Sequence, residues 1–318
     1  MQGLVTVFGG SGFVGGQVVR ALAKAGHRVR VAVRNPNLAY RMRMLGDVGQ
    51  IEVVQANVRN VPSVARAVDG AEAVVNLVGV LWENGRQKFQ TLHVMGARTI
   101  AEQAKAAGVK RLVQISAIGA DVNSASRYQR TKAEGEAAVR AVFPGAVVIR
   151  PSVVFGAEDN FFNKFGQMAA LFPALPLIGG GETKFQPVYV GDVAAVVAKV
   201  VSSPAAEGLT YELGGPAVYS FKALMELILR ETGRNRVLAP IPFFAAGLIG
   251  KVGDLSPINP PLTSDQVESL KTDNVADHGL PGLAEAGVVP TAVESVVPSY
   301  LYRYRKGGQY AEVPAGAF

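Results

Sequence analysis

Tyr128 and Lys132 form a Y-x-x-x-K pair inside the segment 126–142, whose composition predicts a helix. Residues four apart share a helix face, so the phenol and the ammonium would point at one site. A nearby ammonium lowers the pKa of a tyrosine, which makes Tyr128 a candidate general acid or base. Ser116 ends an expected strand 12 residues earlier (128 − 116), and its hydroxyl can hydrogen-bond a substrate carbonyl. These three residues are the candidate catalytic set; an accidental pair on a helix is the alternative.

A glycine-rich loop follows the first apolar run of the chain and has the spacing G-x-x-G-x-x-G. Gly9 permits a tight turn, Gly12 lets the backbone approach a pyrophosphate, and Gly15 lets the next helix pack on the strand. The N-terminus of that helix would direct free N–H groups at the phosphates. We therefore expect a bound dinucleotide, with a turn that binds nothing as the alternative. The expected contacts in this loop are Gly9, Ser11, Gly12, Phe13, Val14 and Gly15.

Arg34 ends the second apolar run, where folds of this type that prefer NAD carry an acidic residue for the ribose 2′-hydroxyl. A guanidinium can instead pair with a 2′-phosphate, which a carboxylate would repel. NADP(H) is thus favoured over NAD(H), and NADPH is the expected cofactor. The alternative is an ordinary solvated arginine.

Further cofactor contacts are expected where later apolar runs end. Asn57 can hydrogen-bond the adenine edge, and the backbone after Asn76 would run along the cofactor. For both segments an ordinary polar loop is the alternative. Lys132 would also hold the nicotinamide ribose. The expected contacts outside the glycine loop and Arg34 are Asn57, Val58, Leu77, Val78, Gly79, Tyr128, Lys132, Pro151 and Val154.

The sequence does not indicate a metal site or a reactive thiol. Cysteine is absent, which excludes disulfides and thiolate ligands. The three histidines, His27, His93 and His278, are too scattered for metal-ligand spacing, so no metal site is expected.

Alternating strands and helices must position these residues. Short runs rich in Val and Ile indicate buried strands at 4–8, 28–33, 51–55, 73–78, 111–116 and 146–150. Between them, helical patterns cover 13–25, 63–68, 87–107 and 126–142. This alternation predicts an α/β fold, a Rossmann-type doubly wound parallel sheet.

After Pro151 the pattern changes, because prolines and glycines become dense. We expect a dinucleotide-binding core over residues 1–155, with returns near 185–215, and a smaller C-terminal lobe and tail over 156–318. Within that lobe the apolar stretch 243–250 is either an ordinary helix or a patch for a membrane edge or partner.

The formal net charge of +7 allows phosphate-rich or acidic partners, but the basic residues are scattered and no nucleic-acid module is present. Nucleic-acid binding is therefore not expected. The first residues resemble neither a signal peptide nor a mitochondrial presequence, and no apolar run is long enough for a transmembrane helix.

Together these residues resemble the extended and atypical short-chain dehydrogenase/reductases over nearly the whole chain. The segments that carry this resemblance beyond the site are RPSVVFG at 150–156, PVYVGDVA at 187–194 and YELGG at 211–215. A narrower resemblance, to the nucleotide-binding accessory subunit of respiratory complex I, rests on SASRYQRTKAEGE at 124–136, RPSVVFGAEDNF at 150–161 and LTSDQVE at 262–268.

The narrower resemblance implies firmly bound NADPH and a mainly structural role, with other complex I subunits as partners, where the peripheral arm meets the membrane. The missing presequence implies a bacterial form, peripheral on the cytoplasmic face of the inner membrane. Two other functions stay open: a soluble NADPH-dependent reductase of a carbonyl or quinone that uses Ser116, Tyr128 and Lys132, and an NADP(H)-sensing regulator.

One departure from the active relatives affects catalysis. Where they usually present an asparagine that holds a proton-relaying water, this chain has His93. We expect His93 to be a core histidine, and its presence puts that relay in doubt.

Overall fold

The computed structural model describes residues 2–256, 260 and 262–310. Within this part of the chain one sheet contains β1 Gln2–Phe8, β2 His27–Val33, β3 Ile51–Gln55, β4 Ala73–Asn76, β5 Arg111–Ile115, β6 Val147–Pro151 and β11 Thr210–Leu213. All neighbours pair in parallel, in the order β11-β6-β5-β4-β1-β2-β3. The order reverses between β1 and β4, and parallel sheets of this kind bind ligands in the crevice outside the strand ends at such a point. The predicted doubly wound Rossmann-type sheet is confirmed.

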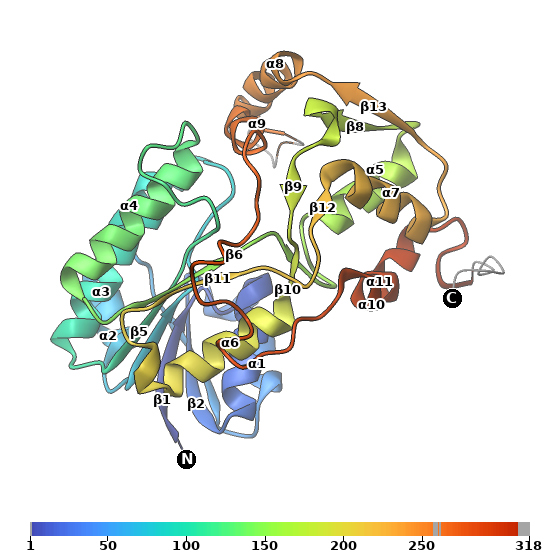
Figure 1. Cartoon of the computed structure of the whole chain (residues 1–318). Coiled ribbons are helices and arrows are strands. Elements are labelled where there is room, and N and C mark those ends of the chain that lie inside the picture. The colour runs from blue at the N-terminus through green and yellow to red at the C-terminus, as the bar shows by residue number, and fades with distance from the viewer. Residues whose placement is uncertain (1, 257–259, 261, 311–318) are drawn as a thin grey trace.

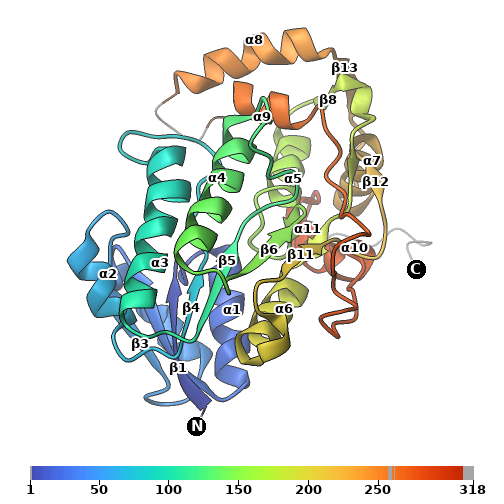
Figure 2. The same cartoon turned by 60° about the vertical axis from the view of Figure 1, so that its left-hand side comes forward.

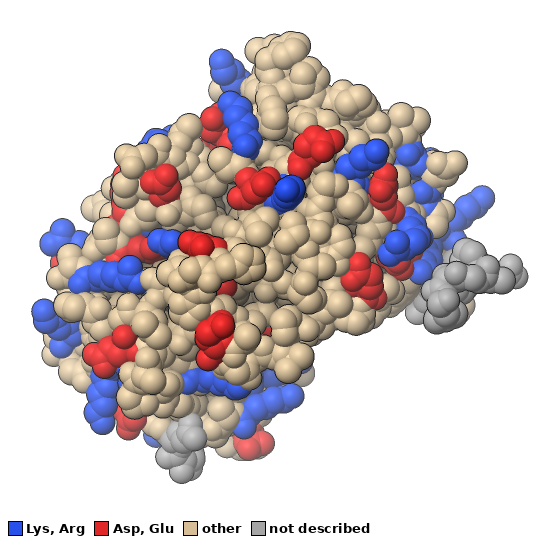
Figure 3. All heavy atoms as spheres, in the orientation of Figure 1, with Lys and Arg blue, Asp and Glu red and all other residues tan. Residues whose placement is uncertain are grey.

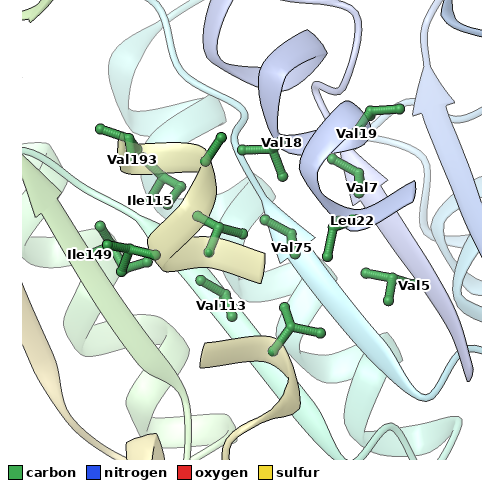
Figure 4. Packing of buried hydrophobic residues seen from close by; sticks show 14 of the residues in the cluster. Val5, Val7, Val18, Val19, Leu22, Val75, Val113, Ile115, Ile149 and Val193 are labelled. Carbon is green, nitrogen blue, oxygen red and sulfur yellow. The ribbon is translucent and has the colours of Figure 1, made fainter. Parts of the chain in front are cut away.

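Helices cover both faces of this sheet (Figures 1 and 2). One face carries α1 Phe13–Lys24 and α6 Val190–Ser202, and the other carries α2 Val61–Val68, α3 Gly96–Ala106 and α4 Arg127–Val142. Figure 4 shows Val18 and Leu22 of α1 and Val193 of α6 packed with Val75 and Ile149 of the sheet. Burial on both faces explains why the strands are nearly continuous runs of Val and Ile.

The segment predicted as one helix over 87–107 is divided in the structure. A π-helical segment, η3 (Gln90–Met95), precedes α3. The wider π turn directs the neighbouring residues Leu92 and His93 into the interior. A single helical periodicity could not predict this, because a π turn shifts the spacing of inward-facing residues.

The C-terminal lobe consists of short strand pairs and helices. The pairs join β7 Val154–Phe155 with β10 Val188–Tyr189, β8 Ala174–Ile178 with β13 Val237–Ile241, and β9 Lys184–Phe185 with β12 Tyr219–Ser220. The helices are α5 Phe162–Leu171, α7 Phe221–Thr232, α8 Phe243–Asp254, α9 Ser264–Ser269, α10 Val293–Val296 and α11 Pro298–Leu301. Buried aromatic and aliphatic residues, among them Phe162, Phe221 and Tyr300, form its own core.

Helix α8 lies at the outer edge of this lobe (Figure 1). It buries only Ala246 and Gly250, whereas Phe244, Leu248 and Val252 are exposed. In the described part of the chain, no helix combines the length and the apolar character that crossing a bilayer requires.

Candidate functional site

A cavity of about 260 Å³ lies where the strand order reverses. Of the residues predicted to bind the cofactor, those that line it are Gly9, Ser11, Gly12, Arg34, Asn57, Val58, Leu77, Val78 and Gly79. The other lining residues, which were not predicted from the sequence, are Phe8, Ala32, Val33, Ala56, Arg59, Val80, Gln87 and Leu92. Several of these directly adjoin predicted positions at strand ends, a signal that could have identified them. Arg59 and Gln87 come from loops and carry no motif.

The glycine loop lines the cavity through Gly9, Ser11 and Gly12. Gly9 has φ +77°, and a Cβ on Gly15 would lie 2.3 Å from the Gly9 carbonyl oxygen, so the turn itself excludes a side chain at Gly15. A Cβ on Gly12 would meet only that oxygen, at 3.5 Å, which is an ordinary contact. Among the described residues, no side chain caps the N-terminus of α1 that follows. Because Gly12 has no side chain, the space next to the N-terminus of α1 stays open. The free N–H groups at this N-terminus can then bind a pyrophosphate.

Four other predicted cofactor contacts do not line the cavity: Phe13, Val14, Pro151 and Val154. Val14 and Val154 pack against the main hydrophobic core. A Cβ on Gly156 would lie 3.3 Å from the Phe13 ring, so Phe13 faces the segment that follows β6. Pro151 is the last residue of β6.

Two guanidinium groups mark the end of the cavity that holds Asn57. Arg34 Nη1 donates to Gln87 Oε1 at 2.9 Å, and Arg59 Nη1 donates to the Arg86 carbonyl at 3.3 Å. Asn57 Oδ1 accepts from the backbone N–H of Arg59 at 3.1 Å. This end of the site is therefore positively charged, as recognition of a phosphate monoester requires.

The structure brings Ser116, Tyr128 and Lys132 together next to Gly79 of the lining, although none of the three lines the cavity itself. Lys132 Nζ donates to the Ile115 carbonyl at 3.0 Å and lies 6.0 Å from the centroid of the Tyr128 ring. A Cβ on Gly79, which lines the cavity, would lie 3.7 Å from Lys132 Nζ. Ser116 is 4% exposed, and its Oγ has no hydrogen-bond partner within the chain as described. A buried hydroxyl without a partner is costly, so this atom fits a site that a ligand completes.

His93 is buried, as a core histidine would be, but it lies against the candidate catalytic residues. Its Nε2 accepts from the Val80 N–H at 3.2 Å, and its Nδ1 lies 3.1 Å from Thr131 Oγ1. The ring packs edge-on to Tyr128, with centroids 5.5 Å apart. Burial and, after it, the charge of Lys132 lower the pKa of His93 to about 3. The ring is therefore neutral near pH 7, with its proton on Nδ1 because Nε2 acts as the acceptor.

The expectation that Lys132 lowers the pKa of Tyr128 is wrong. Burial, followed by the negative charge of Asp265, raises the pKa of the Tyr128 phenol to about 12. Burial also lowers the pKa of Lys132 to about 8. The ammonium donates to a strand carbonyl, while a carboxylate from the C-terminal lobe approaches Tyr128 instead. Near pH 7 the phenol stays protonated.

A second cavity, of about 640 Å³, is lined by residues of the core and by residues in and next to helices α8 and α9. Trp82, Glu83 and Phe89 line it from the core, and Asp254 and Asp265 line it from the lobe. The Phe89 ring touches both His93 and Tyr128, with centroids 5.2 and 5.9 Å away. Nowhere in the described part of the chain do three or more His, Asp or Glu side chains gather as a metal ion would require.

Comparison with known proteins agrees with this geometry. The family model described as NAD(P)H-binding matches residues 9–154. The mitochondrial NADH dehydrogenase (ubiquinone) 1 alpha subcomplex subunit 9 of Mus musculus is 38% identical over 304 residues, which cover 95% of this chain and 80% of that protein. A ceramide reductase of Caulobacter vibrioides is 33% identical over 203 residues, 64% of this chain and 62% of that protein.

Among solved structures, an NADPH-dependent quinone oxidoreductase from Escherichia coli in complex with NADPH has the same fold, with a TM-score of 0.75. That alignment covers 94% of this chain and 99% of the other at 22% identity, so it supports the fold alone. The relationship to the mouse subunit is much closer and spans nearly the whole chain. The chain therefore belongs to the NAD(P)H-binding family, related to the extended short-chain dehydrogenase/reductases, that includes alpha subcomplex subunit 9 of NADH dehydrogenase (ubiquinone).

Proposed function

We propose that this protein is an NADP(H)-binding accessory subunit of respiratory complex I, with a structural or assembly role where the peripheral arm meets the membrane. The observation that carries this proposal is the relationship to the mouse complex I subunit over 95% of the chain. A shared catalytic fold alone would not suffice, because one fold hosts many functions.

In this proposal NADPH lies along the 260 Å³ cavity. The glycine loop holds the pyrophosphate through Gly9, Ser11 and Gly12, and Arg34 pairs with the 2′-phosphate. When bound, the nicotinamide supplies the chemistry of hydride transfer. The remaining proposed contacts are Asn57 and Val58 at the adenine, Leu77, Val78 and Gly79 along the cofactor, Tyr128, Lys132 and Ser116 at the nicotinamide end, and Phe13, Val14, Gly15, Pro151 and Val154 as support behind them.

Two features of the site argue against rapid turnover. A general acid works best when its pKa lies near the working pH, and burial and Asp265 raise the pKa of Tyr128 to about 12. The neutral His93 stands where active relatives have an asparagine, and it uses both ring nitrogens to hold Val80 and Thr131. Both features favour low independent activity.

The exposed apolar face of α8 is the proposed contact with the membrane or a neighbouring subunit. Phe244, Leu248 and Val252 are 76%, 62% and 72% exposed. Figure 3 shows few charged side chains over α8, at the top of the view. An exposed apolar patch of this kind marks an interaction surface. We place this contact on the cytoplasmic face of a bacterial inner membrane.

A soluble NADPH-dependent reductase is the second candidate. The buried Ser116 Oγ, which has no partner among the described residues and lies near Lys132, favours it, since a substrate carbonyl would satisfy this hydroxyl. The Caulobacter vibrioides relative that is named a ceramide reductase gives this candidate a precedent at 33% identity.

The test is to purify the protein from the cells that naturally make it, in mild detergent, and to analyse one sample twice. We expect the chain to co-migrate with complex I and to release about one NADPH per chain on denaturation. A free chain whose NADPH exchanges quickly and which reduces carbonyl or quinone compounds at ordinary enzymatic rates would overturn the structural role in favour of the reductase.

A further inference from the structure

Asp265 belongs to α9 of the C-terminal lobe, but its carboxylate binds the start of α4 in the core. Its Oδ1 accepts from the Arg127 backbone N–H at 2.5 Å, and its Oδ2 accepts from the Tyr128 N–H at 3.1 Å. The same Oδ2 accepts from Ser126 Oγ at 3.0 Å. Figure 2 shows α9 at this end of α4. The three contacts join residues 137 to 139 positions apart in the sequence.

The contacts complete the first turn of α4. A helix leaves its first four N–H groups without partners inside the helix. The local cap, Ser126, accepts from Gln129 N–H through its side chain and from Arg130 N–H through its carbonyl. The two N–H groups nearest the start of α4 therefore depend on Asp265, and one of them belongs to Tyr128 itself.

Asp265 is free for this task because α9 has a separate cap. Thr263 Oγ1 accepts from the Gln266 N–H, and the Gln266 side chain accepts from the Thr263 N–H, which together form a capping box. Ser269 Oγ adds a second contact from α9, because it donates to Ser126 Oγ at 3.0 Å. The lobe thus contacts the start of α4 through two side chains of one short helix.

The charge of Asp265 suits its place. A carboxylate at a helix N-terminus interacts favourably with the helix dipole, and its hydrogen bonds to backbone N–H groups are charge-assisted. This charge also contributes to the raised pKa of Tyr128, after burial. The geometry and the charge both relate Asp265 to the residue proposed to face the nicotinamide.

We propose that Asp265 is a positioning residue through which the C-terminal lobe holds the helix of Tyr128 and Lys132 in place, so that docking of this lobe determines how firmly NADPH is retained. This inference rests on the proposed binding of NADPH. The lobe that carries α8 would then be linked to the nicotinamide end of the cofactor site, and a partner bound to the lobe would slow the release of NADPH.

The test compares Asp265→Asn with Glu268→Gln in the full chain. The control removes a charge from the same helix, but Glu268 pairs with Lys271 at 2.7 Å instead of binding α4. Hydrogen exchange at the amides of Arg127 and Tyr128 reports the contact with or without cofactor. The release rate of NADPH, followed by energy transfer from the only tryptophan, Trp82, reports the consequence.

For Asp265→Asn we expect about tenfold faster exchange at both amides and about tenfold faster NADPH release, since a charge-assisted contact is lost. Glu268→Gln should match the wild type in both. If Asp265→Asn does not fold, Ser269→Ala should give the same changes on a smaller scale. If amide exchange in Asp265→Asn is unchanged, Asp265 does not hold the start of α4. If amide exchange is faster but NADPH release is unchanged, the contact exists but does not affect retention of the cofactor. If the wild type binds no NADPH, both the proposed function and this link are wrong, while the amide exchange still decides the contact.

Discussion

Arg34 is the residue proposed to distinguish NADPH from NADH. It lines the cofactor cavity at the end that also holds Asn57 and Arg59. We expect Arg34→Ala to weaken NADPH binding about 10- to 100-fold, because a charge-assisted pair with the 2′-phosphate is lost. NADH binding should change by less than about twofold. Calorimetric titration of both cofactors measures this, with Arg66→Ala on the outer helix α2 as the control. An equal loss for both cofactors would show that Arg34 does not read the 2′-phosphate.

Lys132 makes the stability of the fold depend on pH. Burial lowers its pKa from 10.5 to about 8, so between these values the unfolded chain binds more protons than the folded chain. The contribution of this group to wild-type stability therefore rises as the pH increases through that window. Lys132→Met removes the buried charge and should stabilise the cofactor-free protein at pH 7 by about 1–3 kcal/mol.

The advantage of Lys132→Met should shrink as the pH is raised from 7 to about 9.5, because the wild-type amine is then largely neutral in the fold. Urea unfolding at the two pH values measures the difference. Replacement of the exposed Lys105 by Met serves as the control and should have little effect at either pH. A constant difference between Lys132→Met and wild type would show that this lysine titrates normally.

At the scale of the elements, the close approach of α4 to η3 requires Gly135. A Cβ at this position would lie 2.2 Å from the His93 carbonyl oxygen, which is backbone and cannot rotate away. We expect Gly135→Ala to destabilise the protein by about 2–4 kcal/mol, since one of the two elements must shift. The shift would also displace His93 and weaken NADPH binding.

Gly16 of α1 is the matched control, because a Cβ there would meet no atom of the described residues within 4 Å. Gly16→Ala should stabilise the protein by about 0.5–1 kcal/mol through higher helix propensity. Thermal unfolding of both variants tests the pair. Opposite signs are expected, and a neutral Gly135→Ala would mean that α4 and η3 pack less closely than described.

At the scale of the whole molecule, α8 presents its apolar face away from both cores. Leu248 and Val252 lie four residues apart on this helix and are both exposed. We expect the double change Leu248→Glu/Val252→Glu to reduce association with vesicles of phosphatidylcholine and phosphatidylglycerol at least about tenfold, because apolar burial is lost and charge is added. Flotation of the protein with these vesicles measures it.

Val289 supplies the control for α8. It is 85% exposed but lies beside α6 of the core, where the neighbouring Thr291 binds Asp192. Val289→Glu should leave vesicle association unchanged. If the double change leaves vesicle association unaltered, α8 is not the contact with a membrane. Release of the chain from complex I by the same double change would then show that the apolar face contacts a neighbouring subunit.

The strand and helix alternation could be predicted from the sequence because it depends on local periodicity. The runs at 51–55 and 111–116, for example, became β3 and β5 with ends that differ by at most one residue. The η3 segment was not predicted, because a π turn breaks the regular helical spacing of inward-facing residues, and its close approach to α4 is visible only in the tertiary structure. The pairing of the short strands in the C-terminal lobe could not be predicted either, because these pairs join residues that are far apart in the sequence.

The sequence by itself determined the glycine loop, the strand ends that carry Arg34 and Asn57, and the spacing that places Tyr128 and Lys132 on one helix face. Each of these depends on residues that are neighbours along the chain. The tertiary structure alone decided the electrostatics of the site: His93 packs against Tyr128, and Asp265 reaches the start of α4 from 137 residues away. Burial and such distant charges set the pKa of a group, so the raised pKa of Tyr128, which burial causes first and Asp265 second, depends on the folded chain and not on residues that are neighbours in the sequence.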